Sequence, residues 1–360
     1  MKRFITYGSI EQFRSVVHNV QHQAQCVGYC EDKQEPIMNR SVVLPVIKVI
    51  GSEKIHGTNA SVCYSNKDGF WVQSRKNIIT PEKDNASCAF QTYAREKEWM
   101  EIIHSLAKEH NIDLDTHIIS VYFEWSGGNI QKLSALTGLD KRAMIFQYFK
   151  VSPLEPQTND GVEQTAKWLT TGNVDNTECN IYNIMNFPTV ELEIDFNHHL
   201  LSQNKMLEMV ATLEKDSLVG KQMGIDGNVG EGYVFTFEYN DKVYRFKVKG
   251  EKHAGKSKIK TLKPVDEEFE NVKIKFVNEV ACISWRLDQM FNEIQSETEG
   301  ILTTKQTGDF LRKVIVDVIK EESDIMIELG IEPKIINGQI SKVAKNYFFD
   351  RLDNDEVGGN

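Results

Sequence analysis

The stretch Ser52-Glu53-Lys54-Ile55-His56-Gly57-Thr58-Asn59 places a lysine between an apolar run and a glycine turn. The β-branched run at residues 42–50 and the segment at residues 60–64 both have the composition of strands. The spacing Lys-x-x-Gly also begins at Lys221, Lys247, Lys252 and Lys305, but only Lys54 lies between two strand-like segments. A lysine in such a turn is either an ordinary surface residue or a buried covalent nucleophile, and the second reading would make the protein an enzyme.

Charged motifs recur further along the chain beside other strand-like segments. They are Ser74-Arg75-Lys76-Asn77, Phe123-Glu124-Trp125, Glu231-Gly232-Tyr233-Val234 and Arg245-Phe246-Lys247-Val248-Lys249. The last two predict a β-hairpin over residues 231–250. Because side chains alternate between the faces of a strand, we expect Arg245, Lys247 and Lys249 on one face. An ordinary strand with its cations in water would look the same, but Lys54 and two glutamates in matching order favour a polyphosphate site.

In this order the motifs resemble the signature of covalent nucleotidyltransferases, which include ATP-dependent polynucleotide ligases and RNA-capping enzymes. Residues 53–59, 128–132 and 231–234, with the basic segment through Lys260, are similar to the RNA ligase 2 family of phage nick-sealing and kinetoplastid editing ligases. The resemblance covers nearly the whole chain and is strongest over residues 50–260. It implies an α+β fold: an ATP-grasp-like nucleotidyltransferase domain built on antiparallel sheets, followed by a small all-α C-terminal domain.

The resemblance also implies catalytic roles. Lys54 would attack the α-phosphate of ATP, while Lys247 and Lys249 would neutralise the phosphates during the transfer. Glu231 would bind Mg²⁺, the divalent cation that accompanies ATP. A lysine has an ordinary pKa of about 10.4, so a nucleophilic lysine must be desolvated or placed near other cations.

Further residues match nucleotide-binding and RNA-binding positions of the family. The nucleotide contacts would be Glu53 at the adenine edge, Ile55 beside it, Arg75 on a phosphate, Glu124 on the ribose, and Phe149 and Val234 on the two faces of the adenine. Phe146 is the alternative register for the stacking aromatic. The RNA contacts would be His56, Asn59, Lys252 and Lys256. The chain departs from the family at Ser52, where arginine is frequent, and at Thr236, where lysine is common.

Composition fits a nucleic-acid enzyme without a generally basic surface. The chain has 360 residues, enough for two compact domains, and a formal net charge of −10. Contact with a polyanion therefore requires a local patch. Residues 242–263 provide one, since they include nine lysines and arginines and the single acid Glu251.

The cysteines give no sign of a disulfide framework. All six are scattered and fit reduced thiols (Cys26, Cys30, Cys63, Cys88, Cys179 and Cys282). His18, His22, Cys26 and Cys30 recur every four residues, which suggests zinc. On one helix they would spread over about 18 Å at 1.5 Å per residue, so we expect a plain helix with buried small residues there.

Periodicity predicts two domains, at residues 1–262 and 266–360. Strand-like runs dominate residues 42–250, with a helical insert at about 85–110. After Pro264 apolar residues recur every three or four positions from Phe269 to Ile294, which predicts one long helix. Two more helices are expected at about 309–329 and 338–352.

The sequence therefore predicts an ATP-dependent RNA ligase that joins 3′-OH and 5′-phosphate RNA ends, with nicked duplex RNA as its substrate. A DNA ligase or a GTP-using capping enzyme is the nearest alternative, disfavoured by His56 and by the absence of an OB-fold pattern. A non-catalytic nucleic-acid-binding module would need only the basic segment and would leave Lys54, Glu124 and Glu231 unexplained. We expect a monomer without a membrane span, located in the cytoplasm or otherwise intracellular, including a host cytoplasm if viral.

Overall fold

The computed structural model describes residues 2–30, 35–39, 42–83, 87–131, 134–155, 158–159, 162–163, 166–250, 252, 264–298 and 302–357. By their internal contacts the residues form two units. Unit 1 comprises Met1–Val16, Ile47–Ile194 and Lys205–Leu262. Unit 2 comprises Val17–Val46, Asp195–Asn204 and Lys263–Asn360. The sequence predicts a domain boundary at residues 262–266. That the parts of the chain before and after it fold independently stays a prediction.

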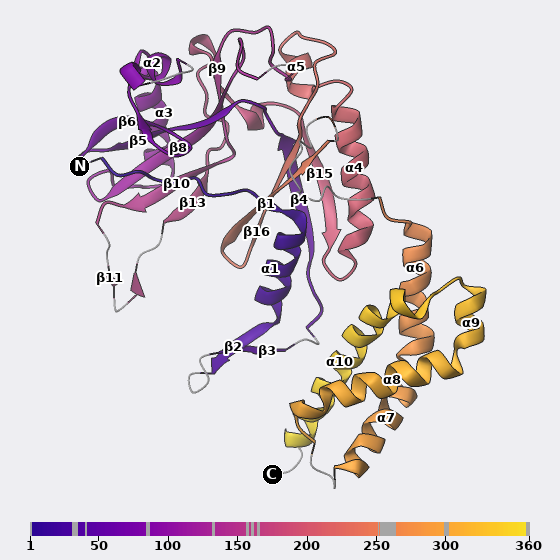
Figure 1. Ribbon diagram of the computed structural model, residues 1–360. Coiled ribbons are helices and arrows are strands. Elements are labelled where there is room, and N and C mark those ends of the chain that lie inside the picture. Colours follow the sequence, from indigo (N-terminus) through magenta and orange to yellow (C-terminus); the bar gives the residue numbers. More distant parts are fainter. Residues whose placement is uncertain are drawn as a thin grey trace. The chain divides into compact units, whose positions relative to one another are not determined.

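Two sheets form the body of unit 1 (Figure 1). The first has the order β1 (Glu11–Gln12), β17 (Lys242–Lys249), β16 (Gly232–Tyr239), β4 (Val46–Glu53) and β15 (Thr189–Asp195). The predicted hairpin is β16 and β17, which pair antiparallel from Gly232 opposite Lys249 to Tyr239 opposite Lys242. The hairpin is thereby fixed beside β4, the strand that leads into Lys54.

The second sheet is larger and also mainly antiparallel. Its order is β13 (Lys167–Thr170), β10 (Tyr148–Pro153), β8 (His117–Ser126), β5 (Thr58–Ser65), β6 (Gly69–Ser74) and β7 (Ile78–Ile79), with β9 (Arg142–Ile145) paired to β8 and β14 (Ile181–Asn183) paired to β9. Two helices, α2 (Cys88–Tyr93) and α3 (Glu96–Glu109), form the predicted insert. Apolar side chains of α3, such as Trp99, join the core of this sheet beside Phe123.

Shorter elements complete this part of the chain. The helices are α1 (Phe13–Gln25), α4 (Ser202–Leu213) and α5 (Leu218–Gln222), with 3₁₀ turns at Pro81–Lys83, Thr177–Cys179, Ile184–Asn186 and His199–Leu201. The strands are β2 (Cys26–Cys30) paired with β3 (Glu35–Met38), and β11 (Thr158–Asn159) paired with β12 (Val162–Glu163). Because α1 ends at Gln25, Cys26 and Cys30 lie on β2 and not on the helix expected from the four-residue spacing.

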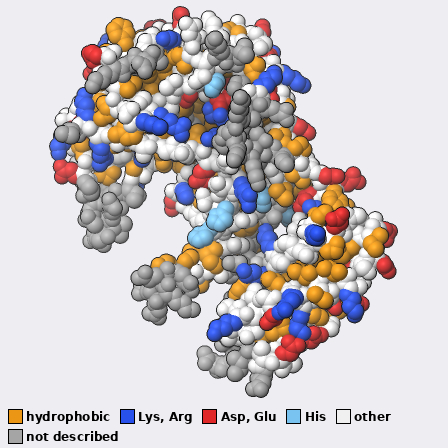
Figure 2. Space-filling model, in the orientation of Figure 1, with side chains coloured by type: hydrophobic (Ala, Val, Ile, Leu, Met, Phe, Trp, Pro, Cys, Tyr) orange, Lys and Arg blue, Asp and Glu red, His pale blue; other side chains and the backbone are white. Residues whose placement is uncertain are grey.

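The C-terminal part is helical. Its elements are α6 (Glu267–Phe276), a π-helical turn (Val277–Ala281), α7 (Ser284–Glu297), a 3₁₀ turn (Thr304–Gln306), α8 (Thr307–Glu321), α9 (Ser323–Glu328) and α10 (Pro333–Val357). They share one apolar core that includes Phe276, Phe291 and Phe310. On the face shown in Figure 2, acidic and basic side chains are interspersed over these helices, with hydrophobic side chains between them.

Two predicted helices are each divided in two: the chain from Phe269 to Ile294 is broken between α6 and α7, and the helix expected at about 309–329 is α8 and α9. The break between α6 and α7 leaves backbone carbonyls without their helical donors, and a buried arginine supplies replacements. Arg286 donates to the carbonyls of Val280 and Ala281, the latter at 3.0 Å, and forms an ion pair with Asp317 at 2.8 Å.

The predicted fold class is confirmed, since mainly antiparallel sheets precede a helical C-terminal region. None of the helices in the described ranges combines the length and the apolar character needed to span a membrane.

Candidate active site

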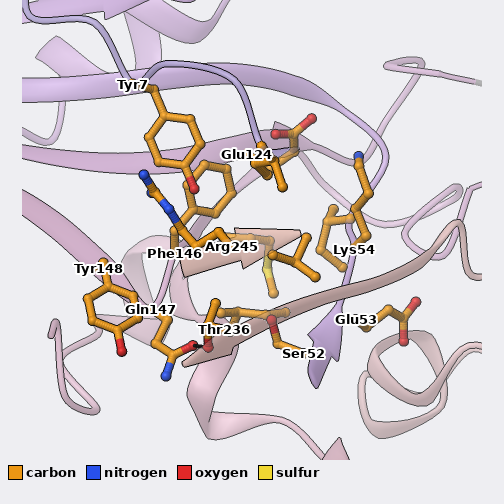
Figure 3. Close-up of a pocket in the computed structure, with 15 residues that line it drawn as sticks. Tyr7, Ser52, Glu53, Lys54, Glu124, Phe146, Gln147, Tyr148, Thr236 and Arg245 are labelled. Atoms are coloured by element: carbon orange, nitrogen blue, oxygen red, sulfur yellow. Dashed lines mark hydrogen bonds between the residues drawn. The ribbon is translucent and has the colours of Figure 1, made fainter. Parts of the chain in front are cut away.

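A pocket with a cavity volume of about 60 Å³ opens in unit 1, lined by residues of both sheets. Figure 3 shows side chains from both sheets directed into it. They come from the segment before β1, the end of β4 and the turn after it, β8, β9, the β9–β10 connection, the start of β10, the 3₁₀ turn at Ile184, β16 and β17 (Tyr7, Ile10, Ser52, Glu53, Lys54, Ile55, Glu124, Met144, Phe146, Gln147, Tyr148, Ile184, Val234, Thr236 and Arg245). Lys54, Glu124, Val234 and Arg245, each from a different sequence motif, therefore meet at one cavity, whereas Arg75, Glu231, Lys247 and Lys249 do not line it.

Lys54 directly follows β4, and its position is fixed by both sheets. Its backbone N–H donates to the carbonyl of Gly232 at 2.7 Å. The next turn requires glycine, because a Cβ on Gly57 would lie 2.3 Å from the carbonyl oxygen of Trp125. The N–H of Gly57 instead donates to Glu124 Oε1 at 3.0 Å. The turn after Lys54 is thus held against the end of β8.

Glu231 gathers three donors around one buried carboxylate. Its side chain is 1% exposed and accepts from Lys54 Nζ at 2.7 Å, from Lys249 Nζ, and from His56 Nδ1 at 3.3 Å. Burial works against ionisation, but the hydrogen bond from His56 and the charges of both lysines hold the pKa of Glu231 well below its usual range. One carboxylate thus faces at least two cations.

Lys247 adds to this excess of positive charge. Its pKa is lowered first by burial and then by the neighbouring cations (Lys249, Lys54 and Arg75), against the opposing pull of Glu231. Arg75 itself is exposed beyond the end of β6. Positive charges this close repel one another, which disfavours the charged form of each lysine. A bound polyanion would remove this repulsion.

Glu124 lies at the same end of the pocket and titrates near neutrality. Burial raises its pKa to about 7, the charge of Glu231 adds to the rise, and Lys54 opposes it. Asn59 lies opposite Glu124 in the pairing of β5 with β8. Near pH 7 the carboxyl group beside Lys54 is therefore partly neutral and partly ionised.

Glu53 and Ile55 also line the pocket, but the carboxylate of Glu53 is already engaged. Glu53 is 2% exposed and accepts from Ser217 Oγ at 2.6 Å and from the N–H of Val219 at 3.0 Å. In Figure 3 its side chain points away from Phe146. The contact ties the end of β4 to the start of α5, so only the backbone of Glu53 remains for an adenine edge. Ile55 packs in the small core beside it.

The assignment of Phe149 as the stacking aromatic does not fit the structure. Phe149 is fully buried in the core of the larger sheet and lies 5.3 Å from the ring of His110. Phe146, the alternative register, lines the pocket together with Val234. The reason is local. β10 begins at Tyr148, so the side chain of the next residue, Phe149, points to the opposite face of the strand, into the core. Phe146 precedes the strand.

Of the two lysines expected on RNA, Lys252 does not line this pocket. Lys252 donates from its backbone N–H to Glu214 Oε1 at 2.8 Å and from Nζ to the Glu214 carbonyl at 3.0 Å. Lys256 lies outside the described residues.

Sequence reasoning gave no site role to Tyr7, Gln147 or Tyr148, which line the pocket opposite its Lys54 end. It placed Arg245 with the phosphate lysines on one strand face, but Arg245 lines this end of the pocket too. Arg245 shares a strand face with Lys247, and this alternation was a usable signal. No local pattern marks Tyr7, because its position depends on tertiary contacts of the segment before β1.

Comparisons with known proteins identify the family of the chain. The RNA ligase family model matches residues 47–249. Among solved structures, the Naegleria gruberi RNA ligase with PPi is similar at a TM-score of 0.40 and 15% identity, and a mutant of that ligase with ATP and Mn at 0.39 and 16%. Each match covers 72% of this chain and 60% of that ligase, so the chain spans less than two thirds of the relative's length. A search of curated proteins found no match. Because the family model covers more than half of the sequence, the chain belongs to the RNA ligase family.

Proposed function

We propose that the protein is an ATP-dependent RNA ligase that acts through three nucleotidyl transfers. The Lys54 ammonium gives a proton to water, and the amine attacks the α-phosphate of ATP; a P–N bond forms, the bond to the β-phosphate oxygen breaks, and pyrophosphate leaves. The 5′-phosphate of RNA then displaces Lys54, which yields RNA capped by AMP. A 3′-OH finally attacks that 5′-phosphate and releases AMP, which seals the strand.

The observation that carries the proposal is the meeting of Lys54, Lys249 and His56 on the single carboxylate of Glu231. The triphosphate of ATP would compete with Glu231 for these cations and free the Lys54 amine to approach phosphorus. Lys247 and Lys249 would then face the α-phosphate and the leaving pyrophosphate. Preorganised charge of this kind supplies most of the catalysis in phosphoryl-type transfer.

The remaining pocket would receive the nucleoside. Phe146 and Val234 supply apolar surfaces for the two faces of a base. Glu124, beside Lys54, would accept hydrogen bonds from the ribose hydroxyls when ionised. These assignments place the phosphates at the Lys54 end of the pocket and the base at the other end.

Mg²⁺ is the expected divalent partner of ATP, but the residues do not fit a resident metal site. Both oxygens of Glu231 already accept from cations. Within the described ranges, no group of three or more histidine, cysteine, aspartate or glutamate side chains could hold an ion. We therefore do not place a metal on Glu231; Mg²⁺ would arrive as the ATP complex, held mainly by phosphate oxygens.

We further propose that the RNA substrate is a nick in a duplex whose 3′-OH strand is RNA. The resemblance at His56 and Asn59 supports this choice. Its physical basis would be the A-form shape and the 2′-hydroxyls next to the nick, which DNA lacks.

Labelling with radioactive ATP tests the proposal. The wild-type protein should form a covalent AMP adduct, and Lys54→Ala should form none. The same variant should still seal RNA supplied with a pre-adenylylated 5′ end, because that substrate bypasses the first step. Lys221→Ala is the matched control, since Lys221 has the same Lys-x-x-Gly spacing on the exposed surface. An adduct that persists on the Lys54 variant would refute the assignment.

A further inference from the structure

A second hollow in unit 1 lies apart from the pocket at Lys54, and we call it the α2 groove. It has a cavity volume of about 680 Å³ and is lined by residues of α2, the turn after β8, the connection to β9 and the turn before β14, with Arg95 after α2. Figure 1 shows α2 and β9 close together at this end of the larger sheet. In the described part of the chain, no lining residue is common to the two cavities.

The α2 groove begins close to the Lys54 end of the active pocket. Gly128 lines the groove and is four residues beyond Glu124, so the two Cα atoms lie no more than about 14 Å apart. Gly128 and Asn129 open the motif at residues 128–132, which has no part in the proposed nucleotidyl transfers. An RNA strand that ends at Lys54 would therefore pass near this groove.

The lining of the α2 groove suits a polar ligand. Leu139 is the one apolar side chain among its described lining residues, and none of them is aromatic. The groove thus offers no ring on which a base could stack, in contrast to the platforms that hold the bases of single strands. A ligand would be held here by hydrogen bonds and charge.

Two cations are positioned in the α2 groove by a chain of neutral side chains. Arg95 Nη1 donates to Gln91 Oε1 at 3.1 Å, and Gln91 Nε2 donates to Ser87 Oγ at 3.4 Å. Lys141 Nζ donates to the same Ser87 oxygen at 2.8 Å. The chain ties the two charged groups to one frame.

Two local features serve the placement of Lys141 at the expense of ordinary geometry. Ser87 precedes α2 as its N-cap residue but makes no capping bond, and its backbone is left-handed at a φ of 57°. A serine at that position normally caps the helix, and the left-handed region is uncommon for residues other than glycine. A Cβ on Gly128 would lie 3.1 Å from Lys141 Cγ, so glycine leaves room for the lysine stem. Strain of this kind gathers at functional sites.

The charge of the α2 groove favours an anion. Within the described ranges, Arg95 forms no ion pair, and only Nη1 of its guanidinium makes hydrogen bonds. Its remaining donors form the fork that matches phosphate oxygens. Asp140 is the one carboxylate among the described lining residues and is exposed, so two cations stand against one acid in a chain with a net charge of −10.

We propose that the α2 groove is a second RNA-binding site, in which Arg95 and Lys141 each contact a phosphate of the strand that leads away from the nick. The inference rests on the proposed function and adds a backbone contact outside the nucleotide pocket. Because the groove has no stacking surface, it would hold RNA without reading its sequence.

Binding of a nicked RNA duplex in the absence of ATP tests the groove. Fluorescence anisotropy at several salt concentrations gives Kd and its salt dependence. Arg95→Gln and Lys141→Gln should each raise Kd roughly 10-fold, because a hydrogen bond from a charged donor is lost. Each should also make the slope of log K against log salt shallower by about 1, since one phosphate contact fewer releases fewer counterions. Arg95→Lys keeps the charge and should keep the slope.

Two shortened duplexes show which strand reaches the groove. One lacks base pairs on the 5′-phosphate side of the nick, and the other lacks them on the 3′-OH side. The wild-type protein and the combined Arg95→Gln, Lys141→Gln variant should bind one of the two equally well, because that duplex no longer extends to the groove.

Lys97→Gln is the matched control, because Lys97 is an exposed cation on α3 that does not line the groove. It should bind RNA like the wild-type protein. Melting temperatures of all variants separate misfolding from lost binding, and ATP labelling, which needs no RNA, should proceed at the wild-type rate.

Unchanged Kd and salt slope in the combined variant would overturn the α2 groove and leave the ligase proposal intact. An equal loss in Lys97→Gln would show a general effect of charge, and lost binding of inorganic phosphate with unchanged RNA binding would show a small-anion site; both overturn the inference. The proposed function fails instead if the wild-type protein forms no adduct with ATP.

Discussion

At the scale of single residues, the site has more positive than negative charges around Glu231. Glu231 is the only carboxylate bonded to Lys54 and Lys249 among the described residues, and Lys247 stands next to them with a lowered pKa. A triphosphate would supply the missing negative charge. The contribution of each lysine to transfer should therefore exceed that of a surface cation.

Replacement of Lys247 or Lys249 by alanine should slow adduct formation by about 10²- to 10³-fold, since loss of one preorganised charge at a phosphoryl group costs about 3 to 4 kcal/mol. Arginine should rescue poorly, because its planar fork does not replace a compact point charge. Rapid-quench labelling measures the rate. Lys242→Ala is the control, because Lys242 is exposed at the start of the same strand. If Lys247→Ala or Lys249→Ala labels at the normal rate, the replaced lysine has no role in the transfer.

Glu124 gives a prediction about pH. Its folded pKa is about 7, whereas an unfolded glutamate titrates near 4.3. Between these values the folded state keeps a proton that the unfolded chain has lost, so this group lowers stability as pH rises through the window. Glu124→Gln cannot ionise and still presents an oxygen to Gly57. Its gain in unfolding free energy over wild type should grow by on the order of 3 kcal/mol between pH 4 and 8. Urea unfolding at both pH values measures this, and parallel pH profiles would contradict it.

At the scale of elements, the turn between β4 and β5 sets where Lys54 can act. Lys54 is bonded through its backbone to β16, and Gly57 through its backbone to Glu124 on β8. The turn thus joins the two sheets at the mouth of the pocket. Any side chain at Gly57 would force this connection apart.

Gly57→Ala should therefore reduce labelling at least tenfold and destabilise the fold by roughly 1 to 3 kcal/mol, the usual cost of an overpacked contact. The added Cβ would meet the Trp125 carbonyl at 2.3 Å. Labelling and thermal melting measure the two effects. Gly308→Ala, on α8 with no atom near the new Cβ, is the control and should be neutral or slightly stabilising. A Gly57 variant with wild-type activity would show that the turn tolerates a shift.

The sequence was informative where the pattern is local. Alternation placed Lys247 and Lys249 on one face of a hairpin, and the structure confirms that hairpin. Alternation could not choose between Phe146 and Phe149, because the choice depends on where β10 begins. The helical stripe after Phe269 continues in three- and four-residue steps through a π-helical turn, so periodicity alone could not show the break.

At the scale of the whole molecule, the division of labour between the nucleotidyltransferase region and the helical end is open to test. A chain that ends at Leu262 retains every residue that lines the pocket. It loses contacts within unit 2, such as the hydrogen bond from the N–H of Val265 to Asn204 at 2.7 Å. Segments of the chain before residue 262 thus pack with residues beyond it.

We expect the shortened chain to label with ATP but to fail at sealing nicked duplexes, because the helical end would hold the RNA. Gel assays should use duplexes with ribose or deoxyribose at the last two 3′-OH positions, and the full chain should seal the ribose form faster. Labelling of both proteins provides the control for folding. Equal sealing by the two proteins would contradict the division, and equal rates on ribose and deoxyribose would point to a general or DNA ligase.

The segment before β1 has a consequence for how the protein is made. Ile5 is bonded through its N–H to Gln73 at 2.8 Å and through its carbonyl to Tyr122 at 3.0 Å, which brings Tyr7 to the pocket beside Arg245. The ribosome synthesises Tyr7 long before β17. The pocket therefore lacks the wall formed by β17 until nearly all of unit 1 has emerged from the ribosome. Contacts between residues so far apart in the sequence slow folding, and apolar surface stays exposed until they form. Synthesis of this protein should accordingly depend on chaperones at the stage when β17 is still in the exit tunnel.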